Sequence, residues 1–209
     1  NSSITYGTVY GEMVSADFNQ DGYMDFAIAA ETANRVHIYT NDGDTDNDGV
    51  GDHTFTLSQN ISGISDPFDL ILHDYNQDGM LDLFVTRYRS SSHTLYALKS
   101  QLDSNGEHEF AAPQAIPGLS ISGYVNDLVI HDFYNDGQVE YLVLSGNSNY
   151  KFNYDAENDT FGSVQSGYFR NVTQPYAGGM GDLNGDGYLD LVLATRYIPS
   201  NSTYTGPTA

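Results

Sequence analysis

Four segments of the sequence share a nine-residue pattern of oxygen-bearing side chains that could bind a metal ion. Three copies, residues 17–25, 74–82 and 182–190, read D-x-N-x-D-G-x-x-D, and a partial copy occupies residues 132–140. The glycine at position 6 permits a turn with positive φ, which folds the oxygens of positions 1, 3, 5 and 9 back toward one point. Oxygen ligands without Cys or His favour Ca²⁺ over zinc or copper.

The carbonyl of position 7, in Tyr23, Met80 or Tyr188, can add a further oxygen to each full copy. The predicted calcium ligands of these copies are Asp17, Asn19, Asp21, Tyr23 and Asp25; Asp74, Asn76, Asp78, Met80 and Asp82; and Asp182, Asn184, Asp186, Tyr188 and Asp190. A single copy is equally well interpreted as an Asp/Gly-rich turn without metal. Three copies in register favour the metal.

The partial copy keeps Asp132, Asp136 and Glu140 as candidate ligands. Tyr134 occupies position 3, and its ring cannot replace an amide oxygen in a tight loop. Glu140 replaces the last aspartate, and its longer side chain can still reach an ion. We expect this site to be the weakest of the series, or to be empty.

A fifth acidic loop, residues 44–52, follows the related pattern D-x-D-x-D-G-x-x-D but lies out of register with the other four. Its candidate ligands are Asp44, Asp46, Asp48 and Asp52. It falls in a predicted outer hairpin, where the other repeats have ordinary turns. It could be a solvated acidic turn, but four carboxylates and a correctly placed glycine favour an additional Ca²⁺ site.

The residues around the loops predict β-strands, and not the amphipathic helix that follows the loop of an EF-hand. Short, nearly continuous apolar runs follow the loops at 26–29, 83–86, 141–144 and 191–194, and similar runs precede two of them at 70–72 and 128–130. The first aspartates of successive loops lie 57, 58 and 50 residues apart. Strand, loop, strand, hairpin and strand at this period predict a four-stranded antiparallel propeller blade.

The sequence therefore predicts one all-β domain, a β-propeller of about four blades with a calcium loop between strands 1 and 2 of each. The predicted blades span about 14–63, 66–117, 123–170 and 176–209, and residues 1–13, with a strand at 4–10, close the last blade. Outer strands are expected at 35–39 and 54–57 in the first blade, and at 94–98 and 109–111, around a turn at 104–106, in the second.

The fourth blade differs from the others at both of its ends. Gly178-Gly179-Met180-Gly181 replaces the apolar first strand, a composition that suits close packing. After its second strand only one further strand is expected, at 202–205. Closure by the N-terminal strand, completion by another molecule, and a larger propeller of which this chain is a part all remain open.

The loops and their flanking strands resemble the FG-GAP/VCBS repeat family, and the resemblance extends over nearly the whole chain. This resemblance implies a β-propeller with Ca²⁺ bound between the first two strands of a blade. The Phe-Gly and Gly-Ala-Pro signatures of the family are poorly kept.

The net charge of −21 comes mainly from the loops, which hold 16 of the 28 acidic residues. Because the chain has no basic patch that could replace phosphate counterions, we do not expect nucleic acid as a partner. No apolar run reaches 18 residues, so no membrane span is predicted. Five glycosylation sequons occur, where chance gives about three, and they weakly favour a glycoprotein. The sequons are Asn1, Asn60, Asn158, Asn171 and Asn201.

Two short motifs outside the metal ligands also repeat. His73-Asp74 and His131-Asp132 stand at the same place before two loops, and this repetition favours a structural role over acid–base catalysis. Thr86-Arg87-Tyr88 and Thr195-Arg196-Tyr197 follow two second strands. There the Arg could stack on a sugar with the Tyr or balance the local acidity, and we favour the second role.

Three functions fit these features. The first is a non-enzymatic, extracellular or cell-surface, calcium-stabilised propeller that serves structure, adhesion or assembly, for example in a surface filament. Its partners would be further copies, another surface protein or a glycan. The second is a carbohydrate-binding, lectin-like propeller, and the third is a fragment of a calcium-dependent polysaccharide-degrading enzyme. We favour the first, because the recognisable chemistry is repeated with the scaffold.

Overall fold

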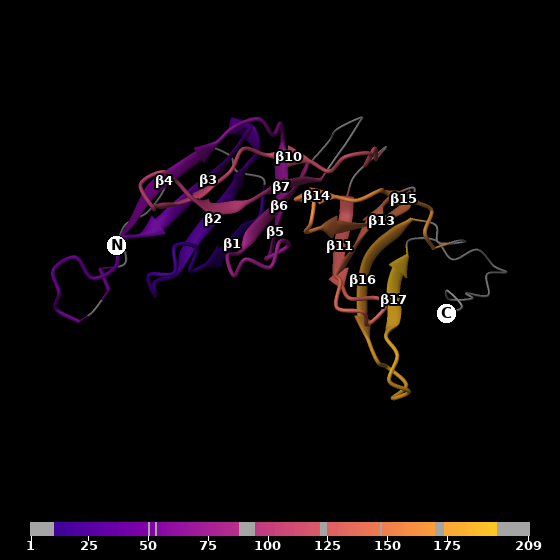
Figure 1. Ribbon diagram of the computed structural model, residues 1–209. Helices are drawn as coiled ribbons and strands as arrows, with labels where there is room; N and C mark the ends of the chain where they lie inside the picture. The colour runs from indigo at the N-terminus through magenta and orange to yellow at the C-terminus, as the bar shows by residue number, and fades with distance from the viewer. Residues whose placement is uncertain are drawn as a thin grey trace. The chain divides into compact units, whose positions relative to one another are not determined.

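The computed structural model of the chain describes residues 11–49, 51–52, 54–87, 95–121, 125–146, 148–169 and 174–195 (Figure 1). These residues form antiparallel sheets and one turn of 3-10 helix, η1 (Glu31–Ala33). The chain divides into two compact units, residues 1–88 with 95–115 and residues 89–94 with 116–209. Among the described residues, no helix has the length and apolar character needed to cross a membrane.

The first sheet of unit 1 has four strands in chain order. They are β1 (Met13–Ala16), β2 (Asp25–Ala30), β3 (Arg35–Asn41) and β4 (Phe55–Ile61). Asn34 ends η1 in the left-handed conformation, with φ of 55°, and starts the return of the chain into β3. The strands predicted at 26–29, 35–39 and 54–57 are confirmed. The strand β1 lies where the predicted blade, starting at about residue 14, required a first strand before the loop.

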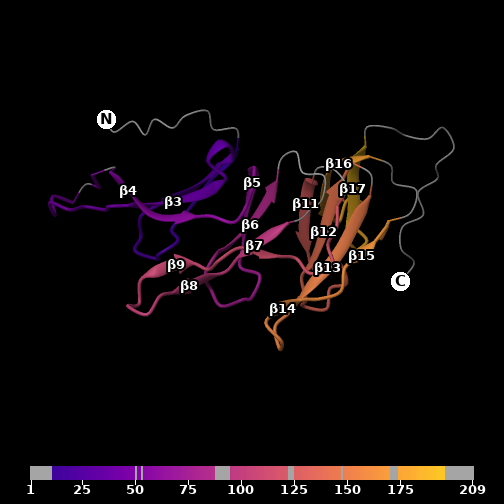
Figure 2. The same ribbon diagram turned by 90° about the horizontal axis from the view of Figure 1, so that it is seen from above.

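The second sheet of unit 1 has the order β10-β7-β6-β5. Its strands are β5 (Pro67–His73), β6 (Asp82–Arg87), β7 (Tyr96–Leu98) and β10 (Gln114–Ala115), and a hairpin of β8 (Ser100–Leu102) and β9 (His108–Phe110) intervenes between β7 and β10. Figure 2 shows this hairpin beside β7.

The prediction that residues 109–111 form the outer strand of the second sheet is wrong. This segment pairs with β8, and the edge of β7 is paired by residues 114–115 instead. The reason is the turn at 104–106, which was correctly predicted. Gly106, with φ of 85°, donates its N–H to the Asp103 carbonyl (3.1 Å) and folds residues 100–110 back on themselves.

The two sheets of unit 1 share one apolar core. Ala27 and Ala29 of β2 pack with Leu70 of β5 and with Leu83 and Val85 of β6. Because side chains alternate between the two faces of a strand, Phe26 and Ile28 of β2 belong to its opposite face. Thus small residues of the first sheet meet larger residues of the second.

Unit 2 contains a third sheet and a two-stranded fourth sheet. The third has β11 (Val125–His131), β12 (Glu140–Ser145), β13 (Asn149–Asp155) and β14 (Thr160–Phe161) in order, with β15 (Gln165–Ser166) also paired to β13. The fourth pairs β16 (Pro175–Gly181) with β17 (Asp190–Thr195). Their common core joins Val129, Leu142 and Leu144 to Leu191 and Leu193.

Two side-chain amides join segments whose proximity the sequence analysis did not predict. Gln59 donates to the Phe110 carbonyl (2.6 Å) and accepts the Phe110 N–H (2.8 Å), which ties β4 to β9. Asn149 makes the same pair of bonds with Phe169, at 3.0 and 2.7 Å. Each amide thus satisfies both polar groups of one residue, as a neighbouring strand would.

The expected strands at 70–72, 83–86, 128–130, 141–144 and 191–194 all lie within observed strands, and 94–98 is represented by β7. The predicted strands at 4–10 and 202–205 lie outside the described residues. Each unit therefore contains two consecutive blade-like sheets. The closure of a ring and the number of blades stay predictions.

The close packing predicted for the glycine-rich strand β16 is confirmed at Gly178. A Cβ atom there would lie 2.9 Å from Val129 Cγ2, 3.0 Å from Leu144 Cδ1 and 3.1 Å from Leu193 Cδ2. A Cβ atom on Gly179 would meet nothing within 4 Å. The contact between the third and fourth sheets therefore requires a glycine at one of these positions and not at its neighbour.

We expect Gly178→Ala to destabilise the protein by about 1 kcal/mol or more, because the added methyl group overpacks the contact between the two sheets. Gly179→Ala is the matched control. It should be neutral or slightly stabilising, because it removes glycine flexibility from the unfolded chain without a clash. Chemical denaturation of both variants measures the difference. Equal effects would contradict the packing argument.

Candidate metal centres

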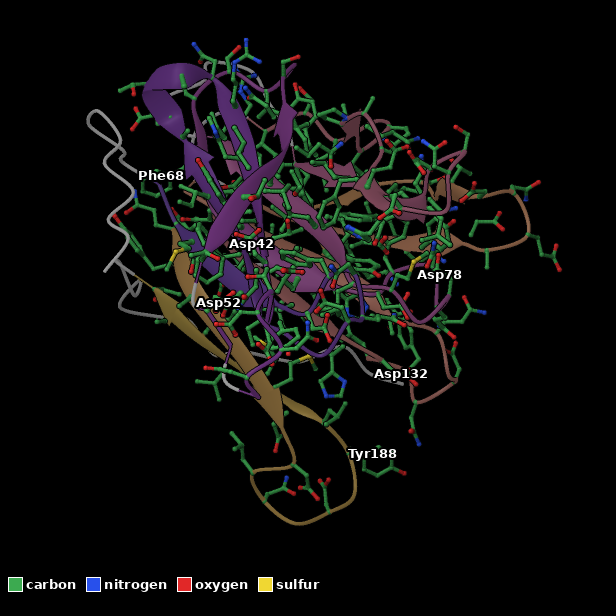
Figure 3. All side chains as sticks on the ribbon, turned by 90° about the vertical axis from the view of Figure 1, so that its left-hand side faces the viewer. Asp42, Asp52, Phe68, Asp78, Asp132 and Tyr188 are labelled. Atoms are coloured by element: carbon green, nitrogen blue, oxygen red, sulfur yellow. The ribbon has the colours of Figure 1, made fainter. Side chains whose placement is uncertain are left out.

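The repeated loops lie where the sequence predicted them, between the first and second strands of each sheet. Residues 17–25 connect β1 to β2, 74–82 connect β5 to β6, 132–140 connect β11 to β12, and 182–190 connect β16 to β17. The fifth loop connects β3 to β4. Figure 3 shows the Tyr188 side chain directed out from the loop that carries it, and this residue is 77% exposed.

The carboxylate at position 1 organises every loop by accepting two backbone N–H groups. In the first loop, Asp21 donates to Asp17 Oδ1 (3.0 Å) and Gly22 donates to Asp17 Oδ2 (2.9 Å). The same two bonds, at 2.8–3.1 Å, form in the other loops to Asp74, Asp132, Asp182 and Asp44. A carboxylate has about four lone-pair sites, so these two bonds do not use its full capacity as an acceptor.

The amide at position 3 fixes the carboxylate at position 5. Asn19 Oδ1 accepts the Asp21 N–H (3.1 Å), and Asn19 Nδ2 donates to Asp21 Oδ2 (2.9 Å). The other full copies contain the same pair of bonds, between Asn76 and Asp78 and between Asn184 and Asp186. The oxygens of positions 1, 3 and 5 are therefore held by the same short turn.

In the fifth loop, the carboxylates of positions 1, 3 and 5 lie close enough together that they could hold a cation. One carboxylate oxygen from each of Asp44, Asp46 and Asp48 lies within 4.8 Å of the other two. In the part of the chain that the structure describes, no other three His, Cys, Asp or Glu side chains meet this condition. A ligand set of oxygens alone suits Ca²⁺, which takes six to eight oxygens.

The carboxylate at position 9 anchors the loop to the sheet. Asp25 is 1% exposed, and it accepts the N–H of Phe18 (3.0 Å) and the N–H of Asn41 at the end of β3 (2.8 Å). Asp82 accepts the N–H groups of Tyr75 (3.0 Å) and Ser100 (2.7 Å) in the same way. The sequence did not suggest the bonds from Asn41 and Ser100, because these donors follow the second strand of each sheet and lie outside the loop.

The corresponding residues of the other loops keep the bond to position 2. Glu140 accepts the Phe133 N–H (2.8 Å) and Asp190 accepts the Leu183 N–H (2.9 Å). Asp52 accepts both the N–H and the hydroxyl of Thr45. The bond to position 2 is thus common to all five loops. Coordination of a cation by any of the predicted ligands, at positions 1, 3, 5, 7 or 9, stays a prediction.

Burial opposes the charge on these anchoring carboxylates. It raises the pKa of Asp82 to about 6, with smaller contributions in the same direction from Asp78 and Asp74, while the N–H groups of Ser100 and Tyr75 oppose the increase. Burial likewise raises the pKa of Asp25 and of Glu140. A bound divalent cation would favour the ionised form of such carboxylates.

Position 4 has a backbone requirement that the sequence analysis missed. Gln20, Gln77, Asn135 and Asn47 all have φ between 55° and 59°, and the fourth loop has a glycine there with φ of 78°. This left-handed conformation is uncommon for residues other than glycine, asparagine and aspartate. The two asparagines and the glycine at position 4 are the residues from which this conformation could have been predicted.

The partial loop keeps the left-handed conformation at position 4, but its third residue, Tyr134, contacts residues outside the loop. The Tyr134 hydroxyl lies 2.5 Å from the Tyr168 hydroxyl, and Lys151 Nζ lies 3.3 Å from the Tyr134 hydroxyl and 4.5 Å from its ring centroid. The Lys151 charge also acts to lower the pKa of Glu140, against the larger effect of burial. A lysine ammonium group therefore supplies positive charge beside this loop, as a cation would in the others.

Neighbouring loops of unit 1 contact one another. Gln20 Nε2 donates to the Gly79 carbonyl (3.0 Å) and so joins the loops of the first and second sheets. The Tyr23 ring lies against the fifth loop, because a Cβ atom built on Gly43 or Gly51 would be 3.1 or 3.5 Å from it. Three candidate sites of this unit are thus physically connected.

The other repeated motifs make structural contacts. His131 Nδ1 lies 3.3 Å from the Asp132 carbonyl oxygen, and burial lowers the pKa of His73. Thr86 Oγ1 accepts the Asp69 N–H (3.0 Å), and Arg87 donates to the Ser65 carbonyl (2.7 Å). The remaining residues, Tyr88, Arg196 and Tyr197, lie outside the described part of the chain.

Of the sequons, Asn60 and Asn158 are exposed, and their glycosylation stays a prediction.

The chain belongs to the FG-GAP-like repeat family, whose model matches it over residues 17–85, 74–143 and 132–193. Each match begins at position 1 of a loop and ends in the second strand of the next sheet. The resemblance inferred from the loops and their flanking strands is therefore confirmed. A comparison with curated proteins found no match.

In calcium-free buffer, we expect Asp82 to contribute less to stability as the pH rises. The folded carboxyl has a pKa of about 6 and the unfolded one a value near 3.8, so between about pH 4 and pH 6 the folded protein holds more protons at this site. Asp82→Asn cannot titrate and should lose this part of the pH dependence. Urea denaturation with EGTA across this range measures it, and an unchanged profile would contradict the assignment.

Tyr134→Asn should increase the calcium-dependent stabilisation of the protein, because it restores an amide oxygen at position 3 of the partial loop. Lys151→Met in the same background should increase it further by removing the competing ammonium charge. Lys151→Met alone should lower stability in calcium-free buffer by about 1 kcal/mol through loss of its contact with the Tyr134 ring. Thermal unfolding with and without calcium tests all three variants. No gain for the double variant would refute the interpretation.

Proposed function

We propose that this chain is a non-enzymatic, extracellular, calcium-stabilised β-propeller module that serves structure, adhesion or assembly. The observation that carries the proposal is the hydrogen-bond arrangement shared by all five loops, in which the carboxylate at position 1 accepts the N–H groups of positions 5 and 6. Because the arrangement recurs in each of the four sheets, and twice in the first, its chemistry serves the scaffold rather than a single reaction centre.

The charge balance supports calcium as the stabilising ion. The five loops hold 16 of the 28 acidic residues in a chain of net charge −21. Neighbouring carboxylates repel one another, and the repulsion grows where they are withdrawn from water. Five divalent cations would offset up to ten of these charges, and calcium at extracellular, millimolar concentration is available for such sites.

The perturbed carboxyl groups also support a scaffold role. Raised pKa values often indicate catalytic acids, but they also arise at structural positions. Asp25 and Asp82 each accept two backbone N–H groups, one from their own loop and one from a segment beyond the second strand. Their burial is thus explained by the attachment of the loop to its sheet.

The contacts between loops extend the stabilisation beyond a single site. Gln20 bonds to the loop of the second sheet, and Tyr23 lies against the fifth loop. A cation that orders one loop would therefore also restrict its neighbours. Calcium then acts as a cross-link of the unit, as disulfides do in many secreted domains; this chain contains no cysteine.

A calcium titration of thermal stability tests this function. A ligand that binds only the folded state raises the midpoint of unfolding, and each site adds about 2.7 kcal/mol when free calcium is 100 times its Kd. Asp186→Ala should reduce this gain more than Asp136→Ala. Each substitution removes a carboxylate that accepts one backbone N–H group of its own loop. Asp186 accepts the Tyr188 N–H, and Asp136 accepts the Gln138 N–H, so the two variants are matched. An unfolding midpoint that does not respond to calcium would reject the proposal.

A further inference from the structure

The second strand of every sheet has two faces with different neighbours. We call its third and fifth residues the forward residues and its second and fourth the backward residues. In unit 1, forward residues Ala27 and Ala29 pack in one core with backward residues Leu83 and Val85 of the next sheet. In unit 2, forward residues Leu142 and Leu144 pack with backward residues Leu191 and Leu193. Consecutive sheets within each unit therefore stack forward to backward.

The forward residues of the last sheet break this pattern of burial. The forward residues of the first three sheets are at most 2% exposed; they are Ala27, Ala29, Phe84, Thr86, Leu142 and Leu144. Their counterparts in β17 are Val192, which is 53% exposed, and Ala194, which is also exposed. The last sheet therefore exposes apolar residues at positions that are buried in the other three sheets.

Beyond Asp190, the first residue of β17, the forward face of the last sheet carries only small, uncharged residues. Val192 is paired with Gly179 across β16, and Ala194 with Ala177. All four side chains are small, and β16 contains no charged residue. Small forward residues also meet larger backward residues in unit 1, where alanines pack against Leu83 and Val85. The missing neighbour is therefore a sheet that presents larger apolar side chains.

The first sheet presents such side chains on its backward face. Phe26 and Ile28 of β2 are half-buried, and Met13, which is paired with Ile28, is 61% exposed. The Phe26 ring stacks on Tyr39 with 4.8 Å between centroids, which holds it in place. This face has the same positions in its strand as Leu83, Val85, Leu191 and Leu193, each of which packs against a forward face.

We infer that the forward face of the β16–β17 sheet binds the backward face of the first sheet of a second copy, so that two copies join head to tail and close as a dimer. The interface continues the forward-to-backward stacking present within each unit. Two copies together bring eight sheets, the upper end of the usual range for propellers. The inference rests on the proposed function, since it gives the assembly module its interface.

A mixing experiment tests the inference, with mass measured by light scattering in calcium-containing buffer. The wild-type chain should have about twice its monomer mass of 22.9 kDa. Val192→Lys places a charge on the forward face and Met13→Lys places one on the backward face. Each variant alone should therefore be a monomer. A mixture of the two variants retains one intact forward face and one intact backward face, and it should recover dimers.

Leu102→Lys is the control, because it replaces an equally exposed apolar residue on the β8–β9 hairpin and should leave the dimer intact. Circular dichroism checks the fold of each variant, and Ala194→Lys replaces Val192→Lys if that variant is misfolded. A monomeric wild-type chain, variants that still dimerise, or a mixture that stays monomeric would each overturn the inference. The calcium titration remains a separate measurement, so calcium stabilisation without association would reject this interface and not the proposed function.

Discussion

The hydrogen bonds between loop carboxylates and backbone N–H groups are the interaction on which the rest of this structure depends. Position 1 closes each loop on itself, and position 9 fastens it to the strand that follows. At Asp25 and Asp82 the same carboxylate also holds a residue beyond the second strand. Each loop thereby fixes where the chain leaves one strand and enters the next, and this sets the apolar faces that stack in each core.

This arrangement places opposing demands on the acidic side chains. The loops need carboxylates to collect N–H groups, but burial and mutual repulsion both disfavour the ionised form. The loop of the third sheet meets them with Lys151 and two tyrosines beside it. For the other loops, we propose that a divalent cation supplies the positive charge. The repeat keeps one backbone conformation at position 4 throughout.

Features encoded within one short segment were predictable from the sequence, and features that depend on pairing between distant segments were not. The five loops and the strands after them follow from spacing and apolar runs. The second partner of Asp82 and the neighbours of Tyr134 come from other strands, so they depend on a register that local patterns do not specify. The error at residues 109–111 has a local cause instead, because the correctly identified turn at 104–106 pairs this segment with the adjacent strand β8 and not with β7.

The fifth loop shows how self-contained this nine-residue unit is. It lies in an outer hairpin, yet it repeats the bonds to position 1, and its base is closed by the Asp52 N–H on the Gly43 carbonyl (2.8 Å) and by Asp42 on Thr54 (2.9 Å). Asp42 and Asp52 are labelled in Figure 3. Apart from the Tyr23 ring that lies against it, this segment brings its own geometry and is held by two adjoining strand ends, which are the properties of a transplantable cassette. Evolution, or a protein engineer, could insert it into hairpins of unrelated scaffolds without redesigning their interiors.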